Sequence, residues 1–290
     1  MGKNMIVLAG GVSSRMKKSV QEITPLEPNL ANDVRYKPKA MIRLGHGGRP
    51  FLDYLLYNIE AAGYRSLVIV VGDGDPSICD HYCKGGDNGR FRDLAIRCVP
   101  QRIPPGRQKP LGTADALLQA LMAVPQWRGS RFTVCNSDNV YSKAVLACLL
   151  EDQHDNAMID YERNALSFSP ERIEQFAVIK RDAEGFLEEI IEKPSNDEIH
   201  RAADSSGRVG VSMNIFRFTY EQIFPYLERV PLHPVRSEKE LPVAVRMMIA
   251  EHPQSMYAIP ASEHVIDLTS PGDIGLVQEF LRREFPDLDS

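Results

Sequence analysis

A short apolar run followed at once by small residues opens the chain and limits the folds available to it. Residues 5–8, Met-Ile-Val-Leu, predict the first buried strand of a sheet. Small residues then occupy five of the six positions 9–14, so the backbone there can turn tightly and approach a ligand closely. Consecutive amide donors in such a turn form a concave site for phosphate oxygens, and Arg15 adds a fixed positive charge. The stretch therefore predicts a strand that ends in a phosphate-binding turn.

The spacing of this turn excludes two common nucleotide-binding folds. It lacks the G-x-G-x-x-G of a dinucleotide-binding fold, and it lacks the G-x-x-x-x-G-K-[ST] of a P-loop. Another kind of phosphate site is needed to explain the glycines and the arginine.

The composition is that of a globular protein without a marked electrostatic bias. Of 290 residues, 43% are hydrophobic and 25% are charged, which is enough to bury a sizeable core. The net charge of −5 gives no reason to expect a nucleic acid or an anionic membrane as a partner, so phosphates must be bound by local cations. No run approaches the ~20 apolar residues of a membrane-spanning helix, and the glycine turn comes too early for a signal peptide.

The five cysteines favour a reducing compartment. Their number is odd, and Cys98, Cys135 and Cys148 lie in apolar stretches, which favours reduced thiols over a disulfide framework. We therefore expect a cytoplasmic protein. Cys79 and Cys83 flank a histidine, but no second ligand pair stands nearby in sequence, so thiols are favoured there over a zinc site.

The order of elements predicts a mixed α/β domain. In the first half, short apolar runs alternate with helical patterns, which predicts a parallel sheet covered on both faces. Strands are expected at 66–71, 94–99, 132–135, 157–161, 176–180, 187–191 and 209–218. Helices are expected at 51–62, 112–122 with Thr113 as its cap, 144–150, 220–227, 241–250 and 272–284. The second half has few helices between its strands, which indicates a smaller, substrate-facing lobe of the same domain.

Two segments between these elements are predicted as loops. Residues 17–37 are polar, contain two prolines and show no clean period. At ~20 residues this segment exceeds the usual connection length, which predicts a mobile lid or a disordered segment. Residues 102–110 are basic and interrupted by prolines.

The first turn, Leu-Ala-Gly-Gly-Val-Ser-Ser-Arg-Met at 8–16, resembles the L-A-G-G-x-G-T-R-[LM] loop of the sugar-phosphate nucleotidyltransferases. Ser13 and Ser14 replace the usual Gly and Thr, and a double serine is also similar to the loop of molybdopterin nucleotidyltransferases, so the loop leaves the substrate open. The resemblance implies that Arg15 stabilises the leaving pyrophosphate. It also implies a set of nucleotide-binding residues in the turn, namely Leu8, Ala9, Gly10 and Gly11.

Three further stretches resemble motifs of the same family in the same order. Residues 37–41 are similar to P-K-[PA]-[ML], which implies that Lys39 reaches the triphosphate. Residues 110–116 are close to P-L-G-T-A-x-A, in which Gly112 lets the backbone lie against a base. Residues 136–138 resemble N-G-D with Ser137 in place of Gly, which implies that Asp138 is a magnesium ligand.

Three stretches of the second half resemble further motifs of the family. Residues 192–194 match E-K-P, which implies that Glu192 binds sugar hydroxyls and Lys193 the sugar phosphate. Asn214 stands at the glycine of N-x-G, a departure that indicates an unusual sugar pocket. Residues 265–273 resemble W-x-D-[IV]-G-T-P-x-D, which implies that Asp267 is the second carboxylate on Mg²⁺.

The resemblance implies a GT-A-like, Rossmann-related fold and a defined reaction. The expected nucleotide-binding half is residues 1–150 and the expected sugar-phosphate-binding half is residues 151–290. A phosphate oxygen of a sugar 1-phosphate would attack the α-phosphorus of a nucleoside triphosphate, giving an NDP-sugar and pyrophosphate with the help of Mg²⁺. The sugar is left open, as is a homo-oligomeric state.

Three alternatives compete with the interpretation as a sugar-phosphate nucleotidyltransferase. Two are enzymes of the same fold, and the third is a protein without catalytic activity. A phosphocholine cytidylyltransferase would need an aromatic cage, but the four candidate aromatics stand at strand spacing and are favoured as core: Tyr161, Phe176, Phe216 and Phe218. A molybdopterin nucleotidyltransferase is the second alternative. The third is an inactive, nucleotide-binding regulatory protein, against which the joint presence of Arg15, Lys39, Asp138 and Asp267 argues.

Gln101, just ahead of the 110–116 motif, suggests a preference for UTP or dTTP. Its position is similar to that of a glutamine which contacts the pyrimidine in relatives that use these nucleotides. A carboxamide offers one donor and one acceptor, which suits the N3–H and a carbonyl of uracil or thymine. A carboxylate, which would suit guanine, does not stand at this position in sequence.

Overall fold

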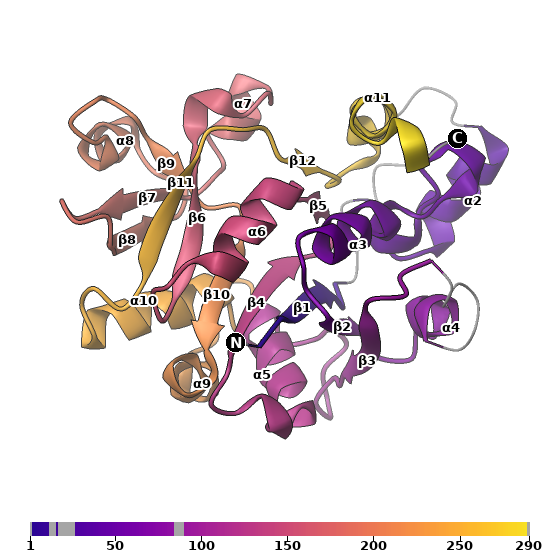
Figure 1. The fold of residues 1–290 in the computed structure, drawn as a ribbon, viewed down its shortest axis with the longest axis horizontal. Coiled ribbons are helices and arrows are strands. Elements are labelled where there is room, and N and C mark those ends of the chain that lie inside the picture. The colour runs from indigo at the N-terminus through magenta and orange to yellow at the C-terminus, as the bar shows by residue number, and fades with distance from the viewer. Residues whose placement is uncertain (1, 12–15, 17–26, 84–89, 289–290) are drawn as a thin grey trace.

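The computed structural model describes residues 2–11, 16, 27–83 and 90–288, and it centres on a ten-stranded sheet (Figure 1). The sheet has the strand order β3-β2-β1-β4-β10-β6-β9-β7-β8, with β11 paired to β6. A two-stranded sheet, β5 with β12, lies apart from it. The strands are β1 (Asn4–Ala9), β2 (Ser66–Gly72), β3 (Ala95–Gln101), β4 (Arg131–Asn136), β5 (Asn139–Val140), β6 (Ala157–Glu162), β7 (Val178–Arg181), β8 (Leu187–Ile191), β9 (Gly210–Val211), β10 (Ile215–Thr219), β11 (Tyr257–Ala261) and β12 (Ile266–Asp267).

Helices cover both faces of the large sheet. Residues of β1 alternate between two separate apolar clusters, with Met5 and Val7 on one face and Ile6 and Leu8 on the other. The first cluster packs against α3 and α6, and the second against α5, α9 and α10. The helices are α2 (Pro28–Tyr36), α3 (Phe51–Ala61), α4 (Ser77–Tyr82), α5 (Thr113–Ala123), α6 (Lys143–Glu151), α7 (Pro170–Ile173), α8 (Asn196–Ala202), α9 (Tyr220–Arg229), α10 (Leu241–Glu251) and α11 (Ile274–Glu284).

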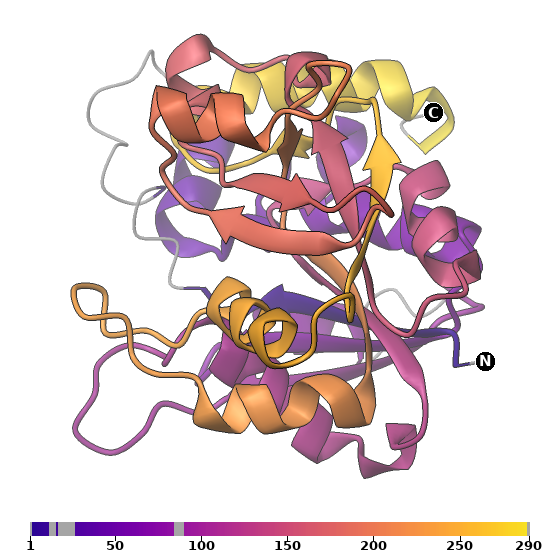
Figure 2. The same cartoon turned by 90° about the vertical axis from the view of Figure 1, so that its left-hand side faces the viewer.

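The two halves of the sheet differ in strand direction. Strands β3, β2, β1 and β4 are parallel, so their carboxyl ends meet at one edge. From β10 onward most pairs are antiparallel, apart from the parallel pair of β6 and β11. Figure 2 shows α9 and α10, in orange, below the sheet and α11, in yellow, above it. The mixed α/β fold predicted from the sequence is therefore confirmed.

Three details of the predicted elements are wrong. Residues 28–36 of the expected loop 17–37 form α2, in which Val34 packs into a third apolar cluster with α3 and α11; residues 17–26 lie outside the described residues. The expected strand 209–218 is interrupted between β9 and β10, where Asn214 has a φ of 56°. Thr113 does not cap α5, because its hydroxyl accepts a hydrogen bond from the Leu241 amide instead.

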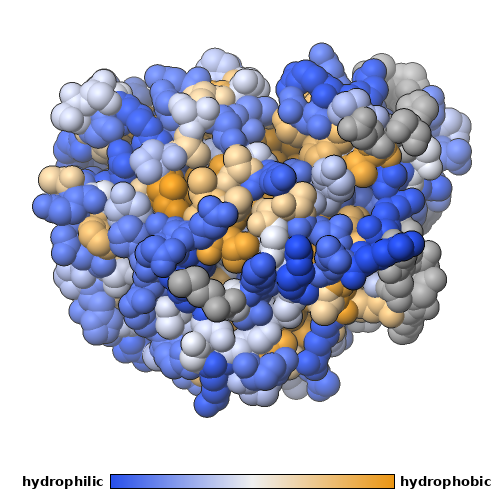
Figure 3. Space-filling model, in the orientation of Figure 1, coloured by the Kyte–Doolittle hydropathy of each residue, from blue (hydrophilic) through white to orange (hydrophobic). Residues whose placement is uncertain are grey.

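The face seen in Figure 3 is mostly hydrophilic, with apolar residues in scattered patches. Within the part of the chain that the structure describes, none of the helices combines the length and the apolar character needed to cross a membrane.

Candidate active site

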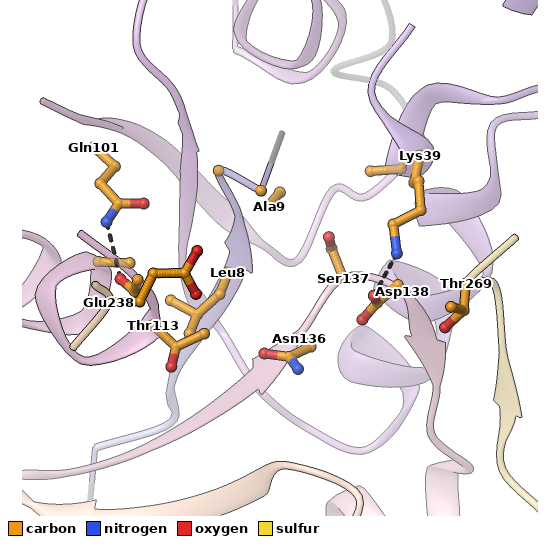
Figure 4. A pocket seen from close by; sticks show the side chains of 15 residues that line it. Leu8, Ala9, Lys39, Gln101, Thr113, Asn136, Ser137, Asp138, Glu238 and Thr269 are labelled. Atoms are coloured by element: carbon orange, nitrogen blue, oxygen red, sulfur yellow. Dashed lines mark hydrogen bonds and ion pairs between the residues drawn. The ribbon is translucent and has the colours of Figure 1, made fainter. Parts of the chain in front are cut away.

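The carboxyl ends of the parallel strands open into a cavity of about 310 Å³, called the first cavity below. Figure 4 shows Gln101 and Glu238 at one end of it, Lys39 and Asp138 at the other, and Ala9 between them. Eight residues that the sequence assigned to the site line this cavity: Leu8, Ala9, Gly10, Gly11, Lys39, Gln101, Gly112 and Asp138.

The turn after β1 comes close to β3 because Gly10 has no side chain. A Cβ on Gly10 would lie 3.0 Å from Gln101 Oε1, which is closer than most Cβ contacts, and 3.4 Å from the Val71 carbonyl oxygen. The glycine therefore allows the turn to pass under Gln101. Arg15, the cation expected next to this turn, lies outside the described residues.

Lys39 and Asp138 meet at the opposite end of the first cavity. Lys39 begins a short 3-10 helix, and its Nζ lies 2.6 Å from Asp138 Oδ2 and donates to the Leu268 carbonyl at 3.0 Å. The segment that carries Lys39 is held by Asp33 of α2, which accepts hydrogen bonds from the backbone and the guanidinium of Arg43. Lys39 and Asp138, which are 99 positions apart in sequence, thus form a charged pair inside the site.

A second cavity, of about 630 Å³, adjoins the first and shares Asn136, Asp138 and Thr269 with it. Asp267 borders this second cavity because β12 pairs with β5, which sets Asp267 opposite Asn139. The Leu268 amide also donates to the Asp138 carbonyl at 2.8 Å. These contacts bring the two predicted metal carboxylates to the same wall.

Arg172 of α7 holds Asp267 in place, and no sequence motif pointed to this residue. Its Nη2 lies 2.6 Å from Asp267 Oδ2 and its Nη1 lies 2.5 Å from Asp273 Oδ1, while Thr269 Oγ1 donates to both oxygens of Asp267. Burial and the charge of Asp138 raise the pKa of Asp267, against the opposing effect of Arg172. An arginine in a short helix, 95 residues from its partner, produces no recognisable motif.

The donor set at this wall suits Mg²⁺. Asp138 and Asp267 are carboxylates of like charge, and their mutual repulsion is the kind that a bound cation relieves. Among residues 2–11, 16, 27–83 and 90–288, no group of three or more His, Cys, Asp or Glu side chains is placed to hold a metal. A cation bound by one or two carboxylates and substrate phosphates, as Mg²⁺ commonly is, fits this arrangement.

The residues expected to bind the sugar phosphate are only partly gathered. Asn214 borders the second cavity, and its φ of 56° explains why an asparagine can replace the family glycine, since asparagine tolerates left-handed backbone. Glu192 and Lys193 border neither cavity. Glu192 Oε2 is 3.2 Å from Arg236 Nη2, and Arg236 itself lines the second cavity. Glu192 is therefore linked to this cavity through Arg236.

Three of the four candidate cage aromatics belong to the core. Tyr161, Phe216 and Phe218 are fully buried, and Tyr161 lies in the cluster on the opposite face of the sheet from the other two. The interpretation of these three as core is therefore confirmed. Phe176 borders the second cavity without them.

Two curated proteins are similar to this chain in sequence. A bifunctional protein GlmU from Staphylococcus epidermidis is 24% identical over 251 residues, which is 87% of this chain and 46% of that protein. A glucose-1-phosphate adenylyltransferase from Vibrio cholerae is 28% identical over 191 residues, which is 66% of this chain and 43% of that protein. The chain thus spans less than half the length of these two relatives.

A solved structure and a family model are also similar to this chain. A solved UDP-glucose pyrophosphorylase, complexed with UDP-glucose, superposes with a TM-score of 0.67 at 18% identity, covering 98% of this chain and all of that one. The model of the nucleotidyl transferase family matches residues 4–261, which include the described part of the glycine turn, Lys39 and Asp138. This chain is a member of the nucleotidyl transferase family, with the mixed α/β fold of a sugar-nucleotide pyrophosphorylase.

Proposed function

We propose that the protein transfers a nucleotidyl group from a nucleoside triphosphate to a sugar 1-phosphate. The observation that carries this proposal is the pair of adjoining cavities, which share Asp138 at their junction. The first cavity has the glycine turn and Lys39 for a triphosphate, and the second is lined largely by amide and hydroxyl side chains suited to a sugar. The reacting phosphates would meet beside Asp138.

The names of the relatives support a sugar 1-phosphate as the acceptor. One relative is named for glucose 1-phosphate and adenylyl transfer, and the structural neighbour for UDP-glucose. Because these names differ in the base, family membership leaves the base of this chain's nucleotide open.

The reaction needs positioning and charge neutralisation rather than a covalent enzyme intermediate. A phosphate oxygen of the sugar phosphate forms a bond to the α-phosphorus, and the bond to the pyrophosphate oxygen breaks. Lys39, held by Asp138, would donate to the triphosphate. By family resemblance, Arg15 and Lys193 would stabilise pyrophosphate and the sugar phosphate.

Asp138 and Asp267 would hold Mg²⁺, which when bound neutralises phosphate charge during the transfer. Arg172 and Thr269 fix the Asp267 carboxylate, so both of its oxygens keep one orientation. Each carboxylate retains acceptor capacity beyond the contacts described, because a carboxylate can accept about four hydrogen bonds or ligands.

The preference for UTP or dTTP loses its support in the structure. Gln101 Nε2 donates to the Gly112 carbonyl and to Asp115 Oδ2, each at 2.9 Å, so both amide hydrogens are engaged. The donor that would read a pyrimidine carbonyl is therefore not available, and the base has to be inferred from the acceptors that remain.

A substrate panel tests the proposed function. Pyrophosphate release is measured with GTP, UTP, ATP and CTP, each combined with several sugar 1-phosphates, with phosphocholine and with molybdopterin. We expect release that requires one triphosphate and one sugar 1-phosphate together. Release only when phosphocholine or molybdopterin is the acceptor would favour the corresponding alternative on the same fold. No release with any pair of triphosphate and acceptor would favour a regulatory protein.

A further inference from the structure

At one end of the first cavity, beside the Thr113 hydroxyl, lie two hydrogen-bond acceptors. They are Gln101 Oε1 and the carboxylate of Glu238, whose side chains lie at the same end in Figure 4. Within the part of the chain that the structure describes, neither acceptor has a hydrogen-bond or ion-pair partner. This end of the cavity is where the proposed function places the base, since Gly112 and the start of α5 form its wall.

The amide of Gln101 is fixed in one orientation. Gln101 is 3% exposed, and its NH₂ group faces a carboxylate and a carbonyl, both of which only accept hydrogen bonds. Asp115 is held in turn by Gln119 Nε2 at 2.8 Å. Rotating the amide by half a turn would bring its oxygen against Asp115, so Oε1 stays toward Gly10 and the cavity.

Glu238 is brought to the same place by a loop that docks on Gly112. The Ala114 amide donates to the Lys239 carbonyl at 3.0 Å, and the Lys239 amide donates to the Leu111 carbonyl. Gly112 has a φ of 104°, and a Cβ there would lie 2.6 Å from the Lys239 oxygen and 3.0 Å from Glu238 Cβ. The glycine is therefore required for this contact, and backbone bonds hold Glu238 beside it. Figure 2 shows this loop, which connects α9 and α10, projecting on the same side as loop 102–110.

We propose that this pair of acceptors selects guanine, so that the nucleotide is GTP; the inference rests on the proposed function. Guanine presents two adjacent donors, N1–H and the 2-amino group, and a carboxylate is a good acceptor for both. Uracil and thymine have a carbonyl on each side of N3–H, and one of these oxygens would face Glu238. Adenine and cytosine offer one amino donor beside a ring nitrogen acceptor. Repulsion between acceptors therefore counts against the other four bases.

Equilibrium binding, without a sugar phosphate, tests the proposal by comparing GTP with inosine triphosphate. The two differ only in the 2-amino group, so the comparison needs no mutation and cannot be confused with misfolding. Titration calorimetry with Mg²⁺ present should show GTP binding about ten- to a hundredfold more tightly than inosine triphosphate, UTP, ATP or CTP. Glu238→Gln should remove most of the difference between GTP and inosine triphosphate. Glu228→Gln, an exposed change at the end of α9, should leave it unchanged.

The main rival role for Glu238 is to bind the ribose hydroxyls. In that case Glu238→Gln would weaken all triphosphates about equally, and GTP and inosine triphosphate would bind alike; either result overturns the proposal. Tight binding of UTP with weak binding of GTP would overturn it while leaving nucleotidyl transfer intact. Failure of every triphosphate to bind would instead contradict the proposed function itself.

Discussion

Charged side chains that hold one another in place define the site at the scale of single residues. Asp138 is paired with Lys39, and Asp267 with Arg172, each at 2.6 Å. A partly buried charge is costly unless it is paired, so each pair holds its two side chains in one orientation. The two carboxylates are thus held in fixed positions on the wall of the second cavity.

Removing either carboxylate charge should abolish most turnover. Asp138→Asn and Asp267→Asn keep the side-chain shape but lose the charge proposed to hold Mg²⁺, so we expect turnover to fall about a hundredfold or more. Initial rates of pyrophosphate release, with circular dichroism to confirm folding, measure this. Asp93→Asn, at an exposed and loosely paired aspartate, serves as the control. A folded Asp138 or Asp267 variant with near-normal turnover would refute the metal assignment, as would activity in excess chelator.

Asn214 should tolerate glycine and resist a β-branched residue. Its φ of 56° is in the left-handed region, where glycine has no steric penalty and valine has a severe one. We expect Asn214→Gly to change the free energy of unfolding by less than about 1 kcal/mol, and Asn214→Val to lower it by about 1–2 kcal/mol. Urea denaturation measures both. Equal stability of the two variants would show that the backbone conformation at this position is not held.

At the scale of elements, α2 supports the segment that carries Lys39. Asp33 is 1% exposed, and it accepts hydrogen bonds from Arg43 and pairs with Lys37 at 3.0 Å. Burial alone would raise the pKa of Asp33, but these cations outweigh burial and hold the pKa below its ordinary value. The pair therefore stabilises the folded state above the unfolded pKa of about 4, and the stabilisation is lost as pH falls through the folded pKa.

The Asp33→Asn variant should show this pH dependence. At pH 7 we expect its free energy of unfolding to be about 1–2 kcal/mol lower than that of the parent protein, because Arg43 is partly exposed and solvent screens the pair. The difference should shrink as the pH falls below about 4. Denaturation curves at a series of pH values test this, and a difference that is independent of pH would argue against an ionised Asp33.

Gly112 precedes α5 and packs against the loop that carries Glu238. An added methyl group there should therefore disturb both the start of the helix and the position of the loop. In Gly112→Ala the new Cβ would lie 2.6 Å from the Lys239 carbonyl, in a backbone conformation that alanine rarely adopts. We expect weaker nucleotide binding and a lower melting temperature. Gly106→Ala, at another positive φ but in open space, separates backbone strain from the lost contact. Equal effects of the two substitutions would show that docking of the loop is unimportant.

At the scale of the whole molecule, the parts that the sequence could predict are those with local patterns. The buried run of β2 and the helical period of α3 are both in place, because each pattern reports directly on burial. Helix α2 escaped prediction because its buried Asp33 depends on Arg43, an ion pair that no hydrophobic pattern reveals. The short pairing of β5 with β12, which sets Asp267 opposite Asn139, likewise has no local signal.

The same distinction applies to the site. Motif resemblance found residues 8–11 of the glycine turn together with Lys39, Asp138 and Asn214, each of which borders one or both cavities. It did not find Arg172 of α7 or Glu238, since tertiary folding brings both to the cavities from distant parts of the chain. The sequence position of Gln101 was informative, but its hydrogen bonds to Asp115 and Gly112, which decide what it can read, became visible only in the structure.

Label transfer tests the central claim, nucleotidyl transfer to a sugar 1-phosphate, most directly. The enzyme is incubated with Mg²⁺, a panel of sugar 1-phosphates and GTP labelled at either the α- or the γ-phosphate, with the other triphosphates in parallel. We expect α-label to appear in a nucleoside diphosphate sugar and γ-label in pyrophosphate, only when both substrates are present. Asp138→Asn, folded but lacking the carboxylate charge, should transfer neither. Transfer of γ-label to the sugar phosphate, or no transfer with any pair of substrates, would contradict the account.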